Sequence, residues 1–193
     1  MILFRSVAWL SGWLIVAPML SAGILADSTT DFSGTQGSRN WYYGYFPNGD
    51  PHSFTQLPYF NAQTKTWQQA TCCPPFTQVG ANSFSQPNGT NNGQEQWAVR
   101  EWQSTFSGPI VVRGRLAKVD ISYTSTGVYG RVFLNHQQVT ITPLVTDYNG
   151  VAYSVALTVA AGDVIDFALA ANGPDSNDLS YLSATISSTA NTV

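Results

Sequence analysis

The sequence predicts an all-β protein, an antiparallel jelly-roll-like β-sandwich built as a single domain. Strand-forming segments recur at intervals of about 8 to 12 residues, and turn-forming residues separate them, as is typical of sandwiches. No useful length of the chain shows the 3.6-residue apolar period of a helix. Only 10% of the 193 residues are charged, against about 25% in average soluble proteins. Ser, Thr, Asn and Gln supply the polar surface instead, which favours an extracellular β protein.

The first 26 residues have the pattern of a secretory signal peptide. A short start with one basic residue, Arg5, precedes the apolar segment 6–20, and small residues follow it. We expect cleavage after Ala26, with Ala22 as the alternative position. The apolar segment is shorter than the ~20 residues of a transmembrane helix, so no membrane span is expected. The prediction is therefore a secreted, extracellular protein whose sandwich domain covers residues 27–193.

The first strand is expected over residues 40–46, because NWYYGYF is dense in strand-forming aromatic residues that alternate between two faces. Residues 47–96 are expected to form a long irregular insertion that begins with a turn. Burial of its aromatic side chains offsets the ordering entropy of a segment this long. We therefore expect the insertion to pack against the sandwich, with Tyr59 and Trp67 near a binding groove.

Beyond residue 97 the alternation becomes regular. Apolar residues occupy every second position of each segment, and polar residues fill many of the positions between them, which is the pattern of half-buried strands. Strands are expected over residues 97–104, 109–119, 127–135, 138–144, 151–159, 164–170 and 179–187.

Four segments of the chain carry recognisable motifs: QGSRNWYYGYF (36–46), EQWAVREW (95–102), GRVFLNHQQV (130–139) and YSVALTVAAGDVIDFAL (153–169). Together they resemble a bacterial secreted module with the pattern QG-x-x-x-W-x-YGY, AVR-x-W and GDxIDF, which is similar to jelly-roll carbohydrate-binding modules. The resemblance covers nearly all of the chain after residue 26. It implies an exported β-sandwich and carries no assigned activity. A loop that often has a His-Pro pair in this module reads Ser85-Gln86-Pro87 here, so a ligand role for that histidine does not transfer.

The two cysteines, Cys72 and Cys73, are adjacent. Neighbouring Cα atoms lie ~3.8 Å apart, below the usual disulfide range of ~4.4–6.8 Å, so a bridge between them is a strained ring. Three states stay open: a vicinal disulfide that locks a turn, intermolecular bridges, or two buried thiols. A zinc site is disfavoured because His52 and His136 do not have metal-ligand spacing relative to the cysteines.

Few residues are available for catalysis. Glycoside hydrolysis uses two carboxyl groups ~5–10 Å apart, and Glu95 and Glu101 are the only glutamates. Glu101 lies beside Arg100 in an expected strand, where an ion pair or a solvated position is the simplest role. Neither histidine lies in a recognisable catalytic motif, so we expect a non-catalytic protein. The small number of basic residues also disfavours a nucleic-acid partner.

The aromatic and amide content favours carbohydrate binding. Sugars present apolar C–H faces that pack on aromatic rings, and hydroxyls that pair with amide and charged side chains. Tyr59 and Trp67 are the preferred ligand-binding residues, because loops carry function more often than strands do. The alternative is that the aromatic rings fill the core. The protein would then be an extracellular structural, matrix or coat protein that self-associates and has no small-molecule site.

Basic residues concentrate between residues 100 and 131. Arg113, Arg115 and Arg131 share the outward parity of their strands, with Tyr129 interleaved. We expect them to form a cationic, aromatic face on one sheet, suited to an acidic polysaccharide. The alternative is cross-strand pairing of these residues with Asp and Glu, which would serve solubility.

The resemblance to jelly-roll binding modules implies a structural Ca²⁺ between the first and last strands. Asp31 precedes the first strong strand, and Asp175 and Asp178 precede the last one. Carboxylates from both ends of the domain are therefore available for the six to eight oxygen ligands that Ca²⁺ takes. The alternative role of these three residues is to cap turns.

Overall fold

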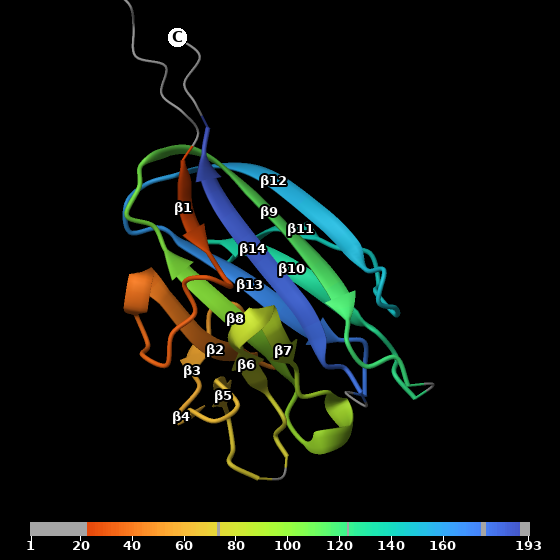
Figure 1. Ribbon diagram of the computed structural model, residues 1–193. Coiled ribbons are helices and arrows are strands. Elements are labelled where there is room, and N and C mark those ends of the chain that lie inside the picture. The colour runs from red at the N-terminus through yellow and green to blue at the C-terminus, as the bar shows by residue number, and fades with distance from the viewer. Residues whose placement is uncertain (1–22, 73, 123, 175–176, 190–193) are drawn as a thin grey trace, which may run out of the picture.

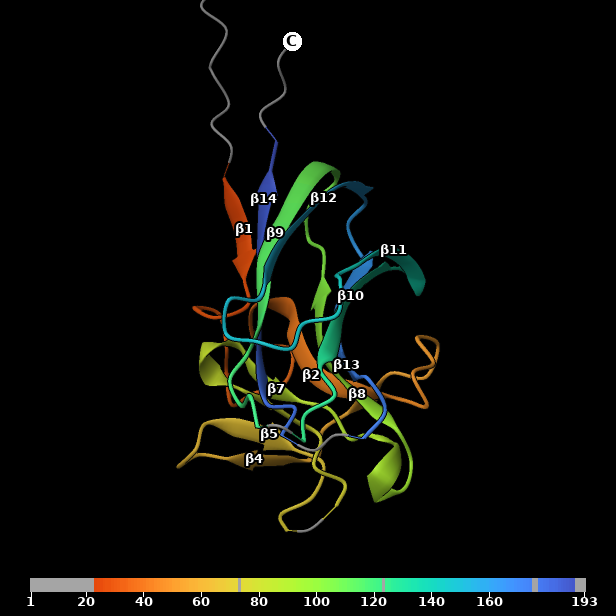
Figure 2. The same ribbon diagram turned by 90° about the vertical axis from the view of Figure 1, so that its right-hand side faces the viewer.

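The chain folds into two antiparallel β-sheets that pack face to face, which confirms the predicted all-β sandwich (Figure 1). The computed structural model describes residues 23–72, 74–122, 124–174 and 177–189. Sheet A has the strand order β12-β9-β14-β7-β6-β5-β4, with β1 also paired to β14, and sheet B has the order β11-β10-β13-β8-β2-β3. In Figure 2, β14 and β9 lie to one side of the molecule and β10 and β13 to the other. Within the described ranges, no helix is long and apolar enough to cross a membrane.

The strands expected from alternation are present, with ends that differ by three residues at most. In β9, for example, Ile110, Val112 and Leu116 are buried while Arg113 and Arg115 are exposed, because successive side chains point to opposite faces. The bounds of these strands are β2 (Trp41–Pro47), β8 (Gln96–Gln103), β9 (Gly108–Lys118), β10 (Val128–Leu134), β11 (Gln137–Ile141), β12 (Val151–Val159), β13 (Val164–Ala171) and β14 (Ser180–Ser188).

A further strand, β1 (Ile24–Asp27), lies within the segment assigned to the signal peptide. It pairs antiparallel with β14, and Ala26 is buried against the main core. The sandwich therefore begins before residue 27, which corrects the expected domain boundary. Of the two cleavage positions, only the one after Ala22 leaves β1 whole. Residues 1–22, which make up the rest of the predicted leader, lie outside the described residues.

Residues 47–96 form short strands, which corrects the expectation of an irregular insertion. One of these strands extends sheet B beside β2, and four extend sheet A beyond β14. Leu57 and Val79 are fully buried, which confirms that the segment packs against the sandwich. The bounds are β3 (Thr55–Gln56), β4 (Tyr59–Asn61), β5 (Thr66–Gln68), β6 (Gln78–Gly80) and β7 (Phe84–Gln86), and the short 3-10 helices are η1 (Ser38–Asn40), η2 (Ala81–Ser83) and η3 (Thr90–Asn92).

The main core lies between the two sheets and contains large aromatic and branched side chains. Its largest fully buried apolar members are Trp41, Trp102, Tyr43, Phe167, Leu57, Ile110, Leu116, Ile165 and Leu169. A second, smaller cluster covers the outer face of sheet B: Phe46, Val99, Phe133 and Ala168, with Phe54 and Trp97 packed against them. Gly44 makes room for this cluster, because a Cβ there would lie 2.4 Å from the Phe54 ring.

Arg100 is a charged residue buried inside the main core, with 1% of its surface exposed. Its guanidinium donates hydrogen bonds to the carbonyl oxygens of Ser28, Gly80 and Phe84, at 3.3, 2.6 and 3.1 Å. Burial lowers the pKa of Arg100 to about 10, so the side chain stays charged at neutral pH. The three carbonyl groups replace the water that a buried charge needs, and they tie the end of β1, β6 and β7 to β8.

Candidate functional site

A row of three glutamines crosses the outer face of sheet A. Gln68, Gln78 and Gln86 lie opposite one another on β5, β6 and β7. Because side chains alternate along each strand, Trp67 and Val79 point into the core while the glutamines point outward. The Gln78 Nε2 atom donates to Gln86 Oε1 at 2.9 Å, which fixes the orientation of both amides.

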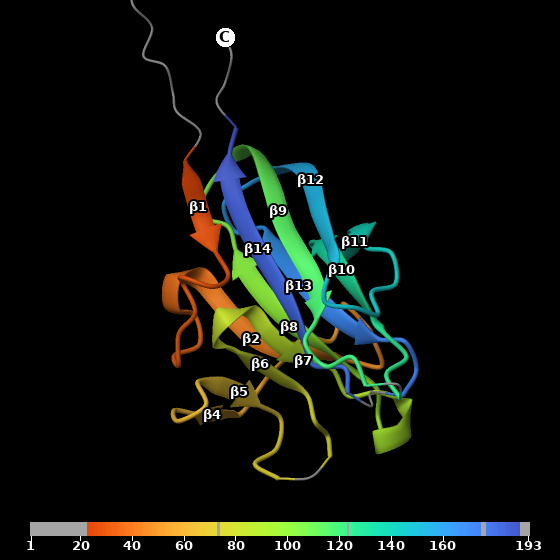
Figure 3. The same cartoon turned by 45° about the vertical axis from the view of Figure 1, so that its right-hand side comes forward.

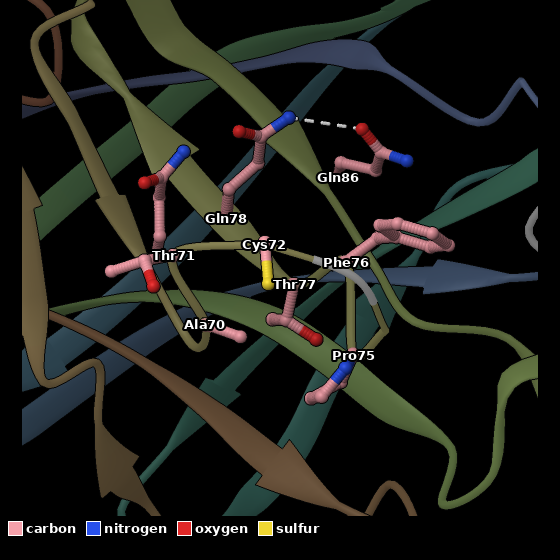
Figure 4. Close-up of a pocket in the computed structure, with 9 residues that line it drawn as sticks. Ala70, Thr71, Cys72, Pro75, Phe76, Thr77, Gln78 and Gln86 are labelled. Carbon is pink, nitrogen blue, oxygen red and sulfur yellow. Dashed lines mark hydrogen bonds between the residues drawn. The ribbon is translucent and has the colours of Figure 1, made fainter.

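The glutamine row lines a pocket of about 150 Å³ (Figure 4). Thr71 and Cys72 form one wall, and Phe76 lies on the opposite side. Thr77 also lines the pocket, where its hydroxyl donates to Gln96 Oε1 at 2.6 Å. The pocket therefore offers amide donors and acceptors, and a hydroxyl group at Thr71, to a ligand.

Two further hollows adjoin this pocket. One, of about 460 Å³, shares Gln68 and Thr71 with it and includes Tyr59, whose side chain is 50% exposed. The other, of about 210 Å³, shares Gln78 and lies over Gly80, which has no side chain to fill the space. The three hollows are neighbours through these shared residues, and we call them together the outer groove.

Aromatic rings stand at both ends of the outer groove. Tyr59 lies at the β4 end. At the other end Phe84 of β7 stacks on Tyr181 of β14, with ring centroids 4.4 Å apart and planes 29° apart. Phe84 lines the groove itself. Among the described residues that line the three hollows, none is charged. An uncharged groove with amides in its centre and rings at its ends suits a neutral, polyhydroxylated ligand.

Trp67 does not offer the exposed ring that the sequence analysis expected. It is 8% exposed, stacks against Tyr43 with the ring planes 18° apart, and packs on Phe60. Its indole N–H donates to the carbonyl oxygen of Ser33 at 2.9 Å. Strand alternation explains why Trp67 is buried, because the neighbouring Gln68 takes the outward position. Tyr59, by contrast, lies in the outer groove.

The four residues expected to form a cationic face are divided between the two sheets. Arg113 and Arg115 lie on the outer face of sheet A in β9, whereas Tyr129 and Arg131 lie on the outer face of sheet B in β10. These faces point away from each other across the sandwich. The prediction of a single cationic face is therefore wrong, because β9 and β10 belong to different sheets.

The arginines also have partners within the chain. Arg115 donates to the carbonyl oxygens of Tyr148 and Asn149, both at 2.8 Å. Arg131 lies over the ring of Trp97, 4.6 Å from its centroid, and donates to Gln138 Oε1 at 2.8 Å. These contacts hold the two side chains against the protein surface.

Two of the aspartates expected to hold Ca²⁺, Asp31 and Asp178, lie far apart in the fold. Asp31 accepts a hydrogen bond from the backbone of Asp27, which pairs with Thr185 in β14. Asp178 lies seven residues before Thr185 in the sequence. At ~3.3 Å per strand residue, this places Asp178 ~23 Å from Thr185. There it forms a fully buried ion pair with Lys118 at 2.7 Å. Within the described part of the chain, no three His, Cys, Asp or Glu side chains are grouped to hold a metal ion.

Two other predicted residues, Asp175 and Cys73, lie outside the described residues. Cys72 is exposed and lines the outer groove. The alternatives for the cysteine pair therefore stay open, except that Cys72 is not buried.

Two carboxyl groups that are far apart in the sequence face each other on the outer face of sheet B. Glu101 in β8 pairs directly with Asp166 in β13. Asp166 is 1% exposed. Burial, and then the charge of Glu101, raise the pKa of Asp166 to about 8, and burial raises the pKa of Glu101 as well. One proton is therefore shared by the pair at neutral pH.

The glutamine row was missed because its strands are only three residues long. A period of two cannot be recognised over so few residues. The only sequence signal is the alternation of Gln68 with Trp67 and of Gln78 with Val79, and it does not reveal that the strands are neighbours.

Comparison with known proteins gives remote similarities only. No family model matches the chain, and no curated protein matches it. Among solved structures, a family 35 carbohydrate-binding module from Clostridium thermocellum has 11% identity and a TM-score of 0.36, over 88% of this chain and 99% of that one. CBM51 from Clostridium perfringens GH95, in complex with methyl-galactose, has 12% identity and a TM-score of 0.37, over 69% and 91%.

A third match is a β-glucosidase from Kluyveromyces marxianus in complex with glucose, with 9% identity and a TM-score of 0.37. It covers 82% of this chain and 17% of that one. At these scores the matches describe what the chain is similar to and assign it no ligand.

Proposed function

We propose that the protein is a non-catalytic, lectin-like carbohydrate-binding protein that holds a neutral glycan in the outer groove. The observation that carries the proposal is the chemistry of this groove. The row of Gln68, Gln78 and Gln86 supplies directed hydrogen bonds, and Tyr59 and Phe84 supply apolar ring surface. Sugar hydroxyls and sugar C–H faces need these two kinds of partner.

The shape of the outer groove favours a chain of sugars over a single one. Two of the hollows lie at successive positions along β5, β6 and β7, and the third lies over β4, with an aromatic ring in each of the two outer hollows. A monosaccharide in one hollow leaves the other two unused. An oligosaccharide that crosses the strands contacts Tyr59, the amides and Phe84 together.

The absence of charge along the groove favours a neutral glycan over an acidic polysaccharide. A uronate or a sulfate needs a charge-assisted partner, such as Arg113 or Arg131. These residues lie outside the groove. We propose a non-catalytic protein because none of the described residues that line the groove has a carboxyl group, whereas glycoside hydrolysis uses two. The proposal includes secretion, because the first 26 residues have the pattern of a signal peptide.

The proposal is tested by measuring binding of the purified protein to a glycan array and to insoluble polysaccharides. We expect saturable binding to one neutral class, with affinity that rises with oligosaccharide length. Tyr59→Ala should weaken binding about tenfold. An aromatic contact contributes up to ~1.5 kcal/mol in addition to the burial of its surface, and this energy corresponds to about a tenfold change in affinity. Tyr148→Ala is the matched control, since Tyr148 is 57% exposed outside the groove.

Two results would overturn the proposal. Saturable binding restricted to acidic glycans, and lost in Arg113→Ala or Arg131→Ala, would move the ligand out of the outer groove. No binding to any glycan class would leave the groove without its proposed ligand, and would favour an extracellular structural protein.

A further inference from the structure

β12 is a long and regular strand at the margin of sheet A. Its nine residues pair with β9 through nine consecutive pairs without a register shift. Figure 3 shows β1, β14, β9 and β12 side by side, with β12 outermost. In the described part of the chain, no strand of sheet A lies beyond it.

The outer edge of β12 presents unpaired backbone groups. Lys118 N–H donates to the carbonyl of Asp147, toward β12, and Val119 N–H donates to Leu179, toward β14. Because N–H and C=O directions alternate along a strand, the even-numbered residues of β9 bond to β12. Their partners are the odd-numbered residues of β12. The residues whose N–H and C=O groups point outward are therefore Ala152, Ser154, Ala156 and Thr158.

The other sheet margins are protected in the ways that natural proteins use. β3 has two residues, β4 has three, and the pairings of β1 with β14 and of β10 with β11 each contain a register shift. Short strands and bulges prevent pairing with another chain. β12 has neither, and residues 151–159 contain no charged residue and no proline. An edge of this length and composition is a template for a further strand.

We propose that β12 pairs with β12 of a second copy of this chain, antiparallel about a two-fold axis at Val155. In this register Ala152 meets Thr158 and Ser154 meets Ala156, so every outward backbone group finds a partner. These four side chains are small and exposed on the outer face, and they leave room for close approach. No like charges meet across the axis. Sheet A of one copy continues into sheet A of the other as a single sheet.

The apolar side chains around this edge are consistent with a covered surface. Tyr153, Val155 and Leu157 face the main core and are only half-buried. Tyr148, just before β12, is 57% exposed, and Leu144 is 41% exposed. The second copy would bring its own apolar residues against them. Outer-groove strands β4–β7 lie on the far side of β14, so the pairing does not depend on the proposed glycan binding.

The pairing is tested by sedimentation velocity of the purified full chain over a wide range of concentrations. We expect a monomer–dimer equilibrium. Amide hydrogen exchange should show the amides of Ser154 and Ala156 protected in the dimer and unprotected after dilution, since in the single chain they face water.

Two variants locate the interface. Ala156→Pro removes an outward N–H and leaves the bonds to β9 intact, because edge strands accept proline on the free side. Ser154→Lys brings two like charges close together across the axis. We expect each variant to be monomeric at concentrations where the wild type is dimeric, with a circular dichroism spectrum like that of the wild type. Ala156→Ser is the matched control and should stay dimeric.

A wild-type chain that is monomeric at every concentration overturns the inference. So does a dimer that persists in both variants, or a larger assembly in place of a closed pair. Ser154→Lys keeps the test decisive if Ala156→Pro fails to fold, because lysine on the exposed outer face leaves the strand geometry unchanged.

Discussion

At the scale of single residues, strand geometry decides which charges meet. Arg100 and Glu101 are neighbours in the sequence, yet they point to opposite faces of sheet B, and Arg100 lies in the main core. Glu101 instead meets Asp166 across the sheet. The sequence shows which residues are neighbours in the chain and not which are neighbours in the sheet. The buried pair was therefore not predictable without the pairing of β8 with β13.

The raised pKa of Asp166 predicts that stability falls as the pH rises. The folded chain holds this proton up to about pH 8, whereas an unfolded aspartate releases it near 3.8. Between these values the folded state binds more protons, so the free energy of unfolding decreases with pH. Asp166→Asn removes this loss. Its melting temperature should exceed that of the wild type by an amount that grows from pH 4 to pH 8 and then levels off.

Asp163→Asn provides the contrasting measurement. Asp163 is half-buried, and a hydrogen bond from the backbone of Ala160 lowers its pKa. The ionised Asp163 carboxylate adds to the free energy of unfolding at neutral pH, and this contribution is lost as the pH falls through the pKa of the folded state. The pH dependence is therefore opposite in sign to that of Asp166. A melting-temperature difference for Asp166→Asn that does not change with pH contradicts the shared proton.

The ion pair of Lys118 with Asp178 predicts a large loss of stability when it is broken. Both side chains are fully buried, 2.7 Å apart. Lys118→Met leaves a buried carboxylate without its lysine partner, which costs ~3–5 kcal/mol in comparable pairs. Urea unfolding should show this loss. The double variant Lys118→Met with Asp178→Leu should recover part of it, and an equal loss in the single and double variants is the contrary result.

At the scale of elements, long strands were predictable and short ones were not. β9 and β12 have nine or more residues, so alternation along the chain identifies both the strand and its inward face. β4, β5, β6 and β7 have three residues each, and they acquire their geometry from pairing in the sheet and from Arg100. The outer groove lies on these short strands. This is why the sequence identified Tyr59 and not the glutamine row.

The position of β1 predicts that removal of residues 23–26 lowers the stability of the sandwich. Compared with a chain that starts at Gly23, one that starts at Asp27 lacks most of β1. It loses the burial of Ala26 and several hydrogen bonds to β14. At ~1 kcal/mol for each hydrogen bond and each small buried group, the loss amounts to at least ~2 kcal/mol. Differential scanning calorimetry of the two chains measures it, and equal melting temperatures would show that β1 adds nothing.

At the scale of the whole molecule, the crossing between sheets was the main feature that the sequence did not reveal. β9 belongs to sheet A, and the next strand along the chain, β10, belongs to sheet B. A hairpin within one sheet would join strands by a connection of similar length, so the sequence is compatible with both. The inward faces were predicted correctly in either case. The surface pattern was not, because outward residues of the two sheets face opposite directions.

The separation of the basic residues predicts that glycan binding does not respond to salt. The ligand in the outer groove meets no charged side chain, so added sodium chloride has no charge pair to screen. The double variant Arg113→Ala with Arg131→Ala should keep wild-type affinity, whereas Tyr59→Ala loses it. Isothermal titration calorimetry at low and high salt tests both statements. A steep salt dependence would place the ligand on an arginine face instead.

The central position of β14 in sheet A has a consequence for when the protein can fold. β14 pairs with β9 on one side and with both β1 and β7 on the other, and it is the last described strand along the chain. One of the hydrogen bonds that join it to the N-terminal segment, from Ala184 to Ser28, spans 156 residues. Sheet A therefore stays incomplete during synthesis until residues 180–188 have emerged from the ribosome. Contacts this distant in sequence also make folding slow. A chain that ends before residue 180 consequently lacks the strand that joins β1, β7 and β9 into one sheet.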